Sequence, residues 1–423
     1  MRPVLAAVLL LSITSPSTPS ALEEFAQLRQ QAHAAHVAGD KRLYLVTVLK
    51  VQRLLNDAPD AIEAAARAYV EAGDNEHALM ALDDFAKLGQ ADETLLTGKD
   101  TAFSALHEMP QYRAILEHFA ANEKAVARSE IAFTLSDPGI LAEDIDYDPQ
   151  SRSFLITSVL KRKIIRVDSD GKSTDFATSP SGWPLLAIKV DPKRKLVWAT
   201  EVAMDGYSAA PKTDWGRSAV LCFDLQTGAL LHRIEGPIHS ALGDMVLTQA
   251  GDPIVSDGDG GGVYRLIGGR LALIDGTDFI SPQTPAMLPD GKHVLIPDYA
   301  RGIGVLDLDN GHVTWLNQGG RTKIALNGVD GLYYDRGTLI LTQNGTSPER
   351  VISIQVDKTL VHALSEQIIE RSTPNFGDPT HGVMVGDSFY YIANSGWNEL
   401  DAHGDLLAGA KLTPARIMRF RLR

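Results

Sequence analysis

Six stretches of the chain alternate apolar and polar positions with the two-residue period of a β-strand. The first, residues 142–148, reads Ala-Glu-Asp-Ile-Asp-Tyr-Asp, so most of its acidic side chains share one face of a strand. A second apolar run follows each stretch, and a third run then leads into a turn. The five later copies of the first run occupy residues 185–191, 242–248, 283–289, 329–335 and 380–386. We expect each copy to be the innermost strand of a four-stranded sheet that recurs about every 40 to 60 residues.

The third runs align in the same way as the first runs. They occupy residues 163–172, 219–228, 262–269, 303–312, 350–359 and 416–423. Six such sheets around one axis form an all-β six-bladed β-propeller, which we expect over residues 131–423. The last copy ends without a fourth strand, whereas residues 131–135, Ile-Ala-Phe-Thr-Leu, precede the first copy. We expect 131–135 to complete the last blade beside 416–420, because closure of the ring removes exposed strand edges.

Residues 22–127 show a different pattern, rich in Ala, Leu, Glu and Gln and poor in Gly, which predicts a small all-α domain ahead of the propeller. An Ala-Gly-Asp turn occurs at 38–40 and returns 34 residues later at 72–74. This spacing resembles that of tetratricopeptide repeats, and the resemblance implies a short helical solenoid that docks other proteins. The alternative is a helical hairpin that packs on the propeller as a cap.

The N-terminal residues have the pattern of a secretory signal peptide, which we place at 1–21. They open with Arg2, continue through an apolar run of about ten residues and end in small and polar residues. The apolar run is too short to span a bilayer. We therefore expect cleavage within 18–22 and a secreted or periplasmic protein without a membrane span.

Charge and cysteine content narrow the classes of function. The net charge of −13 argues against a nucleic-acid partner or an anionic membrane surface, both of which call for basic patches. Cys222 is the only cysteine, so an intrachain disulfide is excluded, and its strand-like surroundings predict a buried thiol. The chain contains no G-x-S-x-G, H-E-x-x-H, C-x-x-C or P-loop motif, which removes the usual serine hydrolase, zincin and nucleotide-binding interpretations.

Potential ligating residues concentrate where the innermost strands begin, because these strand ends face the central channel of a propeller. With Asp144 as reference, the equivalent positions are Asp144, Ala187, Asp244, Thr284, Asp330 and His381. Only one of Glu143 and Asp144 can face the axis squarely, since neighbouring residues of a strand alternate faces. Carboxylates that face one another need a counter-charge, and Ca²⁺, which takes about six to eight oxygen ligands, would supply it. The alternative is that these groups bind only water and neighbouring backbone.

Two loop features add to this picture. Residues 203–218 form a long polar excursion of the second copy, which we expect to be a loop over one face of the ring. Trp215 within it either anchors the loop or shapes a ligand pocket. Residues 297–308, Pro-Asp-Tyr-Ala-Arg-Gly-Ile-Gly-Val-Leu-Asp-Leu, resemble the strand ends of NHL-type propellers. Asp298 in this stretch and Asn394 in the last copy stand at such strand ends, and we expect each to cap its own turn.

The first copy, with Phe-Leu-Ile-Thr-Ser-Val-Leu-Lys after it, resembles the opening blade of paraoxonase-type lactonases and of the senescence-marker-protein/gluconolactonase group. Residues 327–335, Asn-Gly-Val-Asp-Gly-Leu-Tyr-Tyr-Asp, are similar to that group's Asn-Gly-apolar strand. The calcium ligands that the resemblance implies are Glu143 or Asp144, Asp244, and Asn327 or Asp330. In this chain a histidine, His381, stands at a position where the group carries an acid.

Two functions follow from these observations. The resemblance implies an exported, calcium-dependent hydrolase of a lactone or related ester, with His381 as the group that activates a water or the lactone carbonyl. His381 would otherwise only hydrogen-bond an adjacent ring carboxylate. The second function is a non-catalytic binding protein, whose propeller and helical repeats contact proteins or glycans. An enzyme of the first kind needs a metal ion with an open position beside it, so the ring residues distinguish the two.

Overall fold

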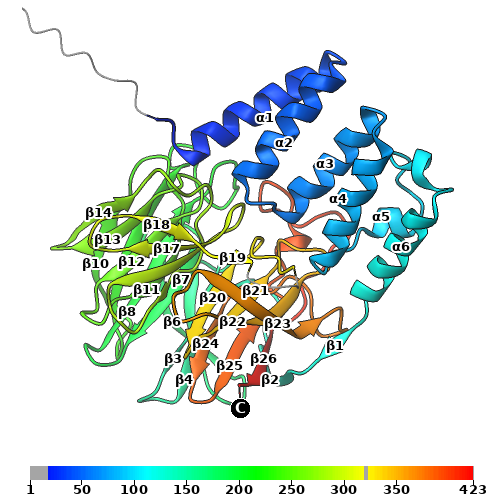
Figure 1. Cartoon of the computed structure of the whole chain (residues 1–423). Coiled ribbons are helices and arrows are strands. Elements are labelled where there is room, and N and C mark those ends of the chain that lie inside the picture. Colours follow the sequence, from blue (N-terminus) through cyan, green and yellow to red (C-terminus); the bar gives the residue numbers. More distant parts are fainter. Residues whose placement is uncertain (1–17, 319–322, 423) are drawn as a thin grey trace, which may run out of the picture.

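The computed structural model describes residues 18–318 and 323–422 of the 423-residue chain. A helical region is followed by six β-sheets, as Figure 1 shows. The prediction of an all-α region followed by an all-β six-bladed propeller is confirmed. Most of the predicted signal peptide falls in residues 1–17, which lie outside the described residues. Among the residues that are described, no helix has both the length and the apolar character needed to cross a bilayer.

Helices make up the described chain ahead of the first strand. They are α1 (Ala21–Val37), α2 (Lys41–Leu54), α3 (Pro59–Glu71), α4 (Asn75–Lys87), α5 (Glu93–Leu96), η1 (Ser104–Leu106) and α6 (Pro110–Asn122). The two Ala-Gly-Asp turns join α1 to α2 and α3 to α4. Gly39 and Gly73 adopt positive φ angles of 69° and 81°, which glycine tolerates best. The side chains of Asp40 and Asp74 then accept from the backbone N–H of the third residue of the next helix. Helix capping therefore explains why the turn recurs, and membership in the tetratricopeptide family stays a prediction.

Each blade is a sheet whose successive strands pair antiparallel from the axis outward. The first blade contains β3 (Ala142–Asp148), β4 (Ser153–Ser158), β5 (Lys163–Val167) and β6 (Ser173–Thr178). The second contains β7 (Leu185–Asp191), β8 (Leu196–Ala203), β9 (Arg217–Asp224) and β10 (Leu230–Glu235). The third contains β11 (Leu242–Leu247), β12 (Pro253–Asp257), β13 (Val263–Ile267) and β14 (Arg270–Asp275).

The remaining blades follow the same order. The fourth contains β15 (Ala286–Met287), β16 (His293–Asp298), β17 (Gly302–Asp307) and β18 (Val313–Trp315). The fifth contains β20 (Gly331–Asp335), β21 (Thr338–Gln343), β22 (Arg350–Val356) and β23 (His362–Arg371), and the short strands β1 (Val126–Ala127) and β19 (Asn317–Gln318) pair with β23. The sixth contains β24 (Gly382–Val385), β25 (Ser388–Ile392), β26 (Arg416–Arg421) and β2 (Glu130–Thr134).

The ring closes through a strand that precedes the first blade. β2 pairs antiparallel with β26, with Phe133 opposite Ile417 (Figure 1). The buried ring of Phe133 packs against Phe154 of the first blade, with 5.2 Å between ring centroids. The prediction that this segment completes the last blade is therefore confirmed. Closure leaves β26 with a partner along both edges, so it presents no unpaired edge to solvent.

The helical region packs on the face of the propeller where the innermost strands begin. The carbonyl oxygen of Leu54, the last residue of α2, accepts from Arg301 Nε at 3.1 Å. The carbonyl oxygen of Leu88, just after α4, accepts from Arg350 Nη1 at 3.3 Å. Arg301 lies in the loop between β16 and β17, and Arg350 begins β22. The helices therefore rest on the rims of the fourth and fifth blades.

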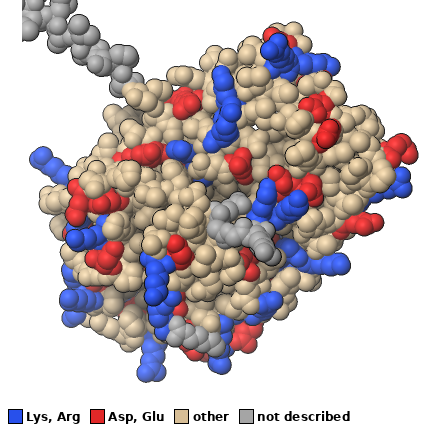
Figure 2. All heavy atoms as spheres, in the orientation of Figure 1, with Lys and Arg blue, Asp and Glu red and all other residues tan. Residues whose placement is uncertain are grey.

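The surface charge is mixed on the face that Figure 2 shows. Acidic and basic side chains are interspersed there over both the helices and the propeller. A surface that binds nucleic acid through its phosphates gathers Lys and Arg into one patch or stripe. The face in view carries no such gathering among the residues described.

Phe133→Ala should destabilise the propeller by about 3–5 kcal/mol, because it opens a cavity where the closing strand meets the first and last blades. Ile131 lies on the same strand but is 44% exposed. Ile131→Ala should therefore change the free energy of unfolding by less than about 1 kcal/mol. Urea unfolding of the two variants measures the difference, and equal losses would contradict the role given to the closing strand.

Arg350→Ala should lower the free energy of unfolding by about 2–4 kcal/mol, because it leaves the buried side-chain oxygen of Gln343 without its donor. Arg350 is fully buried, and its Nε donates to that oxygen at 2.7 Å. The matched control is Arg113→Ala on the exposed side of α6, expected to stay within about 0.5 kcal/mol of the parent. Urea unfolding measures both, and a neutral Arg350→Ala would show that the contact between Arg350 and Gln343 does not stabilise the fifth blade.

Candidate functional site

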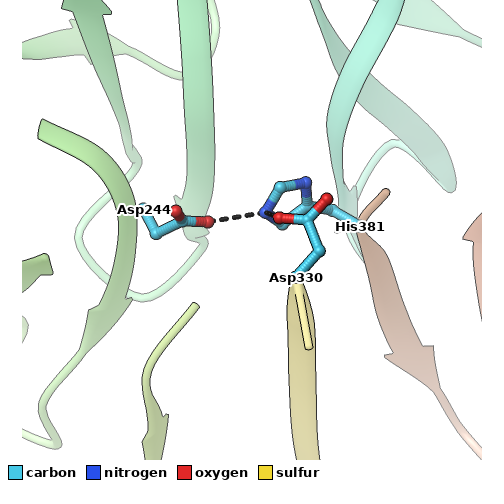
Figure 3. Close-up of side chains that lie close together, drawn as sticks. All are labelled: Asp244, Asp330 and His381. Carbon is cyan, nitrogen blue, oxygen red and sulfur yellow. Dashed lines mark hydrogen bonds and ion pairs between the residues drawn. The ribbon is translucent and has the colours of Figure 1, made fainter. Parts of the chain in front are cut away.

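Three of the six ring positions meet at the centre of the channel. Asp244 on β11, Asp330 just before β20 and His381 just before β24 present ligating atoms that all lie within 4.8 Å of one another (Figure 3). All three side chains are buried. They meet because each innermost strand begins at the axis, so residues at the same register face one another across it. Two carboxylates and one imidazole form a donor set that can hold a metal ion.

Hydrogen bonds hold His381 at both ring nitrogens. Nδ1 lies 2.8 Å from the carbonyl oxygen of Glu143, and it carries a proton because a carbonyl oxygen only accepts. Nε2 lies 2.6 Å from Asp244 Oδ1 and 3.8 Å from Asp330 Oδ1. The hydroxyl of Thr284 donates to the same Asp244 oxygen at 2.6 Å. His381 therefore contacts a ring carboxylate, and its Nε2 points into the cluster.

Burial and mutual repulsion shift the protonation of this cluster. Burial lowers the pKa of His381, but the charges of Asp330, Asp244 and Asp144 outweigh burial and hold it well above its usual value. Burial raises the pKa of Glu143 to about 8, and the charges of Asp330 and Asp244 add to the rise while His381 opposes it. Burial likewise raises the pKa of Asp330 to about 6, against the opposing charge of His381. One imidazolium therefore does not compensate all the carboxylates around it.

The reference residue of the ring, Asp144, does not join the cluster. Its carboxylate accepts from the backbone N–H of Ile188 at 2.8 Å and from Lys189 Nζ at 2.6 Å. Burial lowers the pKa of Lys189, but Asp144 and Asp146 outweigh burial and raise it. Lys189 is a counter-ion that we did not predict. Its signal in the sequence is a lysine inside the apolar run Leu-Leu-Ala-Ile-Lys-Val-Asp, two positions after Ala187.

Glu143 lies beside the cluster, and both its backbone carbonyl and its carboxylate accept hydrogen bonds. Its backbone carbonyl accepts from His381 and from Thr380 Oγ1, the latter at 2.8 Å. Its buried carboxylate accepts from Trp397 Nε1 in the short helix η2 (Trp397–Glu399). Tyr207 of the long second-blade loop packs near Trp397, with 6.1 Å between ring centroids. A carboxyl group with a raised pKa thus lies under an aromatic cover at the edge of the cluster.

Asn327, one of the residues implied as ligands, takes a different role in the structure. Its side-chain N–H₂ donates to the carbonyl oxygens of Ala300 at 2.8 Å and Leu55 at 3.3 Å, so it joins the helical region to the propeller. Asn344 is the amide that contacts the cluster, because its Nδ2 donates to Asp330 Oδ2 at 2.8 Å. Asn344 directly follows the end of β21 and is not part of an innermost strand, so alignment of innermost strands does not find it.

The loop residues singled out in the sequence have structural roles. Trp215 Nε1 donates to the carbonyl oxygens of Tyr207 and Ala210 at 3.2 and 3.1 Å, so it anchors the long loop. The carboxylate of Asp298 accepts from four backbone N–H groups of the surrounding loops. Asn394 accepts from a backbone N–H at 2.7 Å and donates to a nearby hydroxyl at 3.0 Å. The capping role predicted for Asp298 is confirmed, because two of its donors are Ala300 and Arg301 of its own turn. The prediction for Asn394 is wrong, because its partners Thr413, Pro414 and Arg416 belong to the segment that leads into β26.

Glu143 makes stability depend on pH in metal-free buffer. Its folded-state pKa of about 8 lies above the ordinary value of 4.5. The stability linked to this group is therefore full below about pH 4.5 and is lost as the pH rises toward 8. Glu143→Gln removes the titration and should reduce the loss of stability between pH 5 and pH 8 by at least about 1 kcal/mol.

Urea unfolding at the two pH values in the presence of EDTA measures this effect. Glu117→Gln, at an exposed position of α6, is the matched control and should follow the parent at both values. A Glu143→Gln variant with the parent's full pH dependence would contradict the assignment.

Comparison with known proteins adds only distant similarities. No protein-family model and no curated protein sequence matches the chain. Among solved structures, one titled as a putative oxidoreductase (glucose dehydrogenase) from Thermus thermophilus is 14% identical and has a TM-score of 0.47, covering 70% of this chain and 99% of its own. A gluconolactonase from Xanthomonas campestris is 15% identical with a TM-score of 0.47, over 70% and 97% of the two chains. A calcium-binding regucalcin from Agrobacterium tumefaciens is 15% identical with a TM-score of 0.44, over 69% and 93%.

Proposed function

We propose that this protein is a metal-dependent hydrolase of a lactone or related ester, with the metal held by Asp244, Asp330 and His381. The observation that carries the proposal is the convergence of these three buried side chains within 4.8 Å at the channel centre. The Nδ1–H of His381 donates to a backbone carbonyl. This is the arrangement in which a histidine presents Nε2 to a metal ion, because the second hydrogen bond fixes the ring and its tautomer.

The charge of the cluster fits a divalent cation. Glu143, Asp244 and Asp330 surround a single imidazole, and the raised pKa values of Glu143 and Asp330 reflect burial and carboxylate repulsion. A cation there would relieve that repulsion, and its binding would release protons. The imidazole nitrogen favours Mn²⁺ or Zn²⁺, whereas Ca²⁺, the metal expected from the sequence, favours an all-oxygen set such as the three carboxylates alone.

A divalent metal at this position would polarise a substrate carbonyl or lower the pKa of a water molecule. With Nε2 of His381 directed to the two aspartates, we assign this histidine to metal binding rather than to proton transfer. Glu143 then remains as the carboxyl group that lies beside the cluster and is not one of the three ligands, with its backbone carbonyl against His381. Trp397 holds its carboxylate in place. Glu143 is therefore the residue to which we assign proton transfer in the hydrolysis.

A non-catalytic binding protein is the second function we consider, and one groove favours it. The groove has a volume of about 620 Å³ and lies between α1, α2 and α3. Its rim carries Arg29, His33 and His36, its floor includes Val48, and none of its described lining residues is acidic. In a chain with a net charge of −13, such a groove suits an acidic protein segment. On this alternative the acidic cluster would respond to no metal ion.

We further propose that the protein is exported by the N-terminal segment 1–21 and acts in the periplasm or outside the cell. The support is the charged start and short apolar core of that segment. N-terminal sequencing of the protein recovered from its native host tests this directly. A mature chain that begins within 18–22 is the expected result, and a chain that still begins at Met1 would overturn it.

Asp330→Asn should weaken binding of Mn²⁺ or Zn²⁺ at least tenfold, because it keeps the volume of the side chain and removes the charge that holds a cation. It should also abolish any hydrolysis of lactones. Titration calorimetry and thermal melts with Mn²⁺, Zn²⁺ and Ca²⁺ measure binding, since a ligand of the folded state raises the melting temperature by mass action. Release of acid from a panel of γ- and δ-lactones measures activity.

The control is Asp309→Asn, at an exposed turn of the fourth blade, which should behave as the parent in both assays. If the melting temperature of the parent protein responds to none of the three metals, the metal proposal is wrong and a non-catalytic binding function is favoured. A response to Ca²⁺ alone would show that His381 is not a ligand. Metal binding without hydrolysis of any lactone or ester would overturn the assigned activity.

A further inference from the structure

A second layer of side chains lines the channel below the acidic cluster. Within a strand, the residue two positions after each ring position lies one pleat further on and on the same side. In the six blades these residues are Asp146, Lys189, Val246, Ala286, Leu332 and Val383. All six line a single pocket of about 290 Å³. The pocket is therefore part of the channel, one pleat beyond the cluster.

The pocket lies on the side of the cluster away from the helices. The helices contact the face where the innermost strands begin, through Arg301 and Arg350. The second layer lies further along the same strands, toward the opposite face. Thr284 lines the pocket and donates to Asp244 Oδ1 at 2.6 Å, so its hydroxyl separates the two levels. A molecule in the pocket would lie against this hydroxyl without entering the cluster.

One wall of the pocket is charged and the rest is apolar. Blades three to six contribute mainly aliphatic and aromatic side chains, which include Met287, Tyr334 and Met384. Blades one and two contribute Asp146 and Lys189. Such a combination of a largely apolar cavity with a small number of fixed polar groups is typical of small-molecule sites.

Lys189 has a hydrogen-bond donor to spare on that charged wall. An ammonium group has three N–H donors. Two of them are used, because Nζ lies 2.6 Å from Asp144 Oδ2 and 2.8 Å from the carbonyl oxygen of Ile188. Among the described residues nothing else accepts from Nζ, and Lys189 lines the pocket. The third N–H is therefore available to an acceptor in the pocket.

The local charges exclude an ionic head group. The negative charges of Asp144 and Asp146 both act on Lys189 and raise its pKa. The carboxylate of Asp146 already accepts from the backbone N–H of Val190 at 2.6 Å and of Tyr147 at 2.8 Å. A ligand carboxylate would meet two aspartates in a partly desolvated site, and a ligand ammonium has no lone pair with which to accept from Lys189. A neutral acceptor such as a carbonyl oxygen avoids both costs.

We propose that this pocket binds a neutral aliphatic molecule that accepts one hydrogen bond from Lys189, with its chain against Met287, Leu332 and Met384. A volume of about 290 Å³ is roughly ten times the 30 Å³ or so that one water molecule occupies in the liquid, so the pocket has room for a molecule of roughly ten non-hydrogen atoms. The ligand class is therefore an amide, ketone or ester of about six to eight carbon atoms. The site is independent of the metal centre and of the proposed hydrolysis.

Titration calorimetry with hexanamide on the whole protein, in buffer containing EDTA, tests the proposal. Hexanamide should bind in the millimolar range or more tightly, and hexanoate and hexylamine should bind at least tenfold more weakly. Met384→Trp should abolish binding by filling the pocket, and Met287→Trp is a second variant that fills it from another blade. Met80→Trp is the matched control, because Met80 is 59% exposed on α4 and should leave binding unchanged.

The double variant Lys189→Met with Asp144→Asn removes the donor together with the charge of its hydrogen-bonded partner, and should weaken hexanamide binding at least tenfold. Cooperative thermal unfolding identifies which variants are folded. Hexanamide binding is then compared between the parent and whichever of Met384→Trp and Met287→Trp is folded. The proposal is overturned if hexanamide does not bind the parent. It is also overturned if a folded pocket-filling variant binds like the parent, or if hexanoate binds as tightly as hexanamide. Loss of metal binding in Asp330→Asn leaves this test unaffected, so the two proposals fail separately.

Discussion

Closure of the ring is the constraint on which the rest of the structure depends. β2 precedes the first blade and pairs with β26 of the last, so two segments almost 290 residues apart share one sheet. Only in a closed ring do all six innermost strands face one axis at the same register. That register brings Asp244 within 2.6 Å of His381, although 137 residues separate them in the chain. The candidate site is thus a consequence of closure rather than of any local motif.

Closure also concentrates acidic groups, and the protein contains the counter-charges that make the concentration tolerable. Lys189 pairs with Asp144, and His381 pairs with Asp244, both at 2.6 Å. Asp144, Asp244 and His381 are buried, so removal of the partner of any of them leaves a charge in a medium of low polarity. Among the residues that the structure describes, no cation pairs with the carboxylate of Glu143, and its pKa rises to about 8. The site is therefore most negative where Glu143 faces the cluster, which is the place where an external cation would have the largest effect.

The sequence was sufficient to predict the blades and their register, because strand alternation and blade length are local properties of the chain. The closing strand was also predictable, since the last copy lacked a fourth strand. The contacts of Asn327 were not, because they depend on how the helices dock, and docking joins Asn327 to Leu55 across 272 residues. Lys189 was missed for a related reason. It lies one pleat from the ring position, and we compared only one residue per strand.

The same alternation explains why the channel has two chemically different layers. The upper layer takes a residue from each blade, and the lower layer takes the residue two positions later, so one set of six strands specifies both. Asp330 and His381 of the upper layer are followed by Leu332 and Val383, whereas Ala187 is followed by Lys189. In the fifth and sixth blades the channel residue is therefore polar in the upper layer and apolar in the lower layer. In the second blade the order is the opposite. The layer nearer the helices is dominated by carboxylates, whereas the layer toward the opposite face is apolar apart from Asp146 and Lys189. Because a slip of one residue in any innermost strand would turn each of its side chains to the opposite face of that strand, both layers depend on the same register.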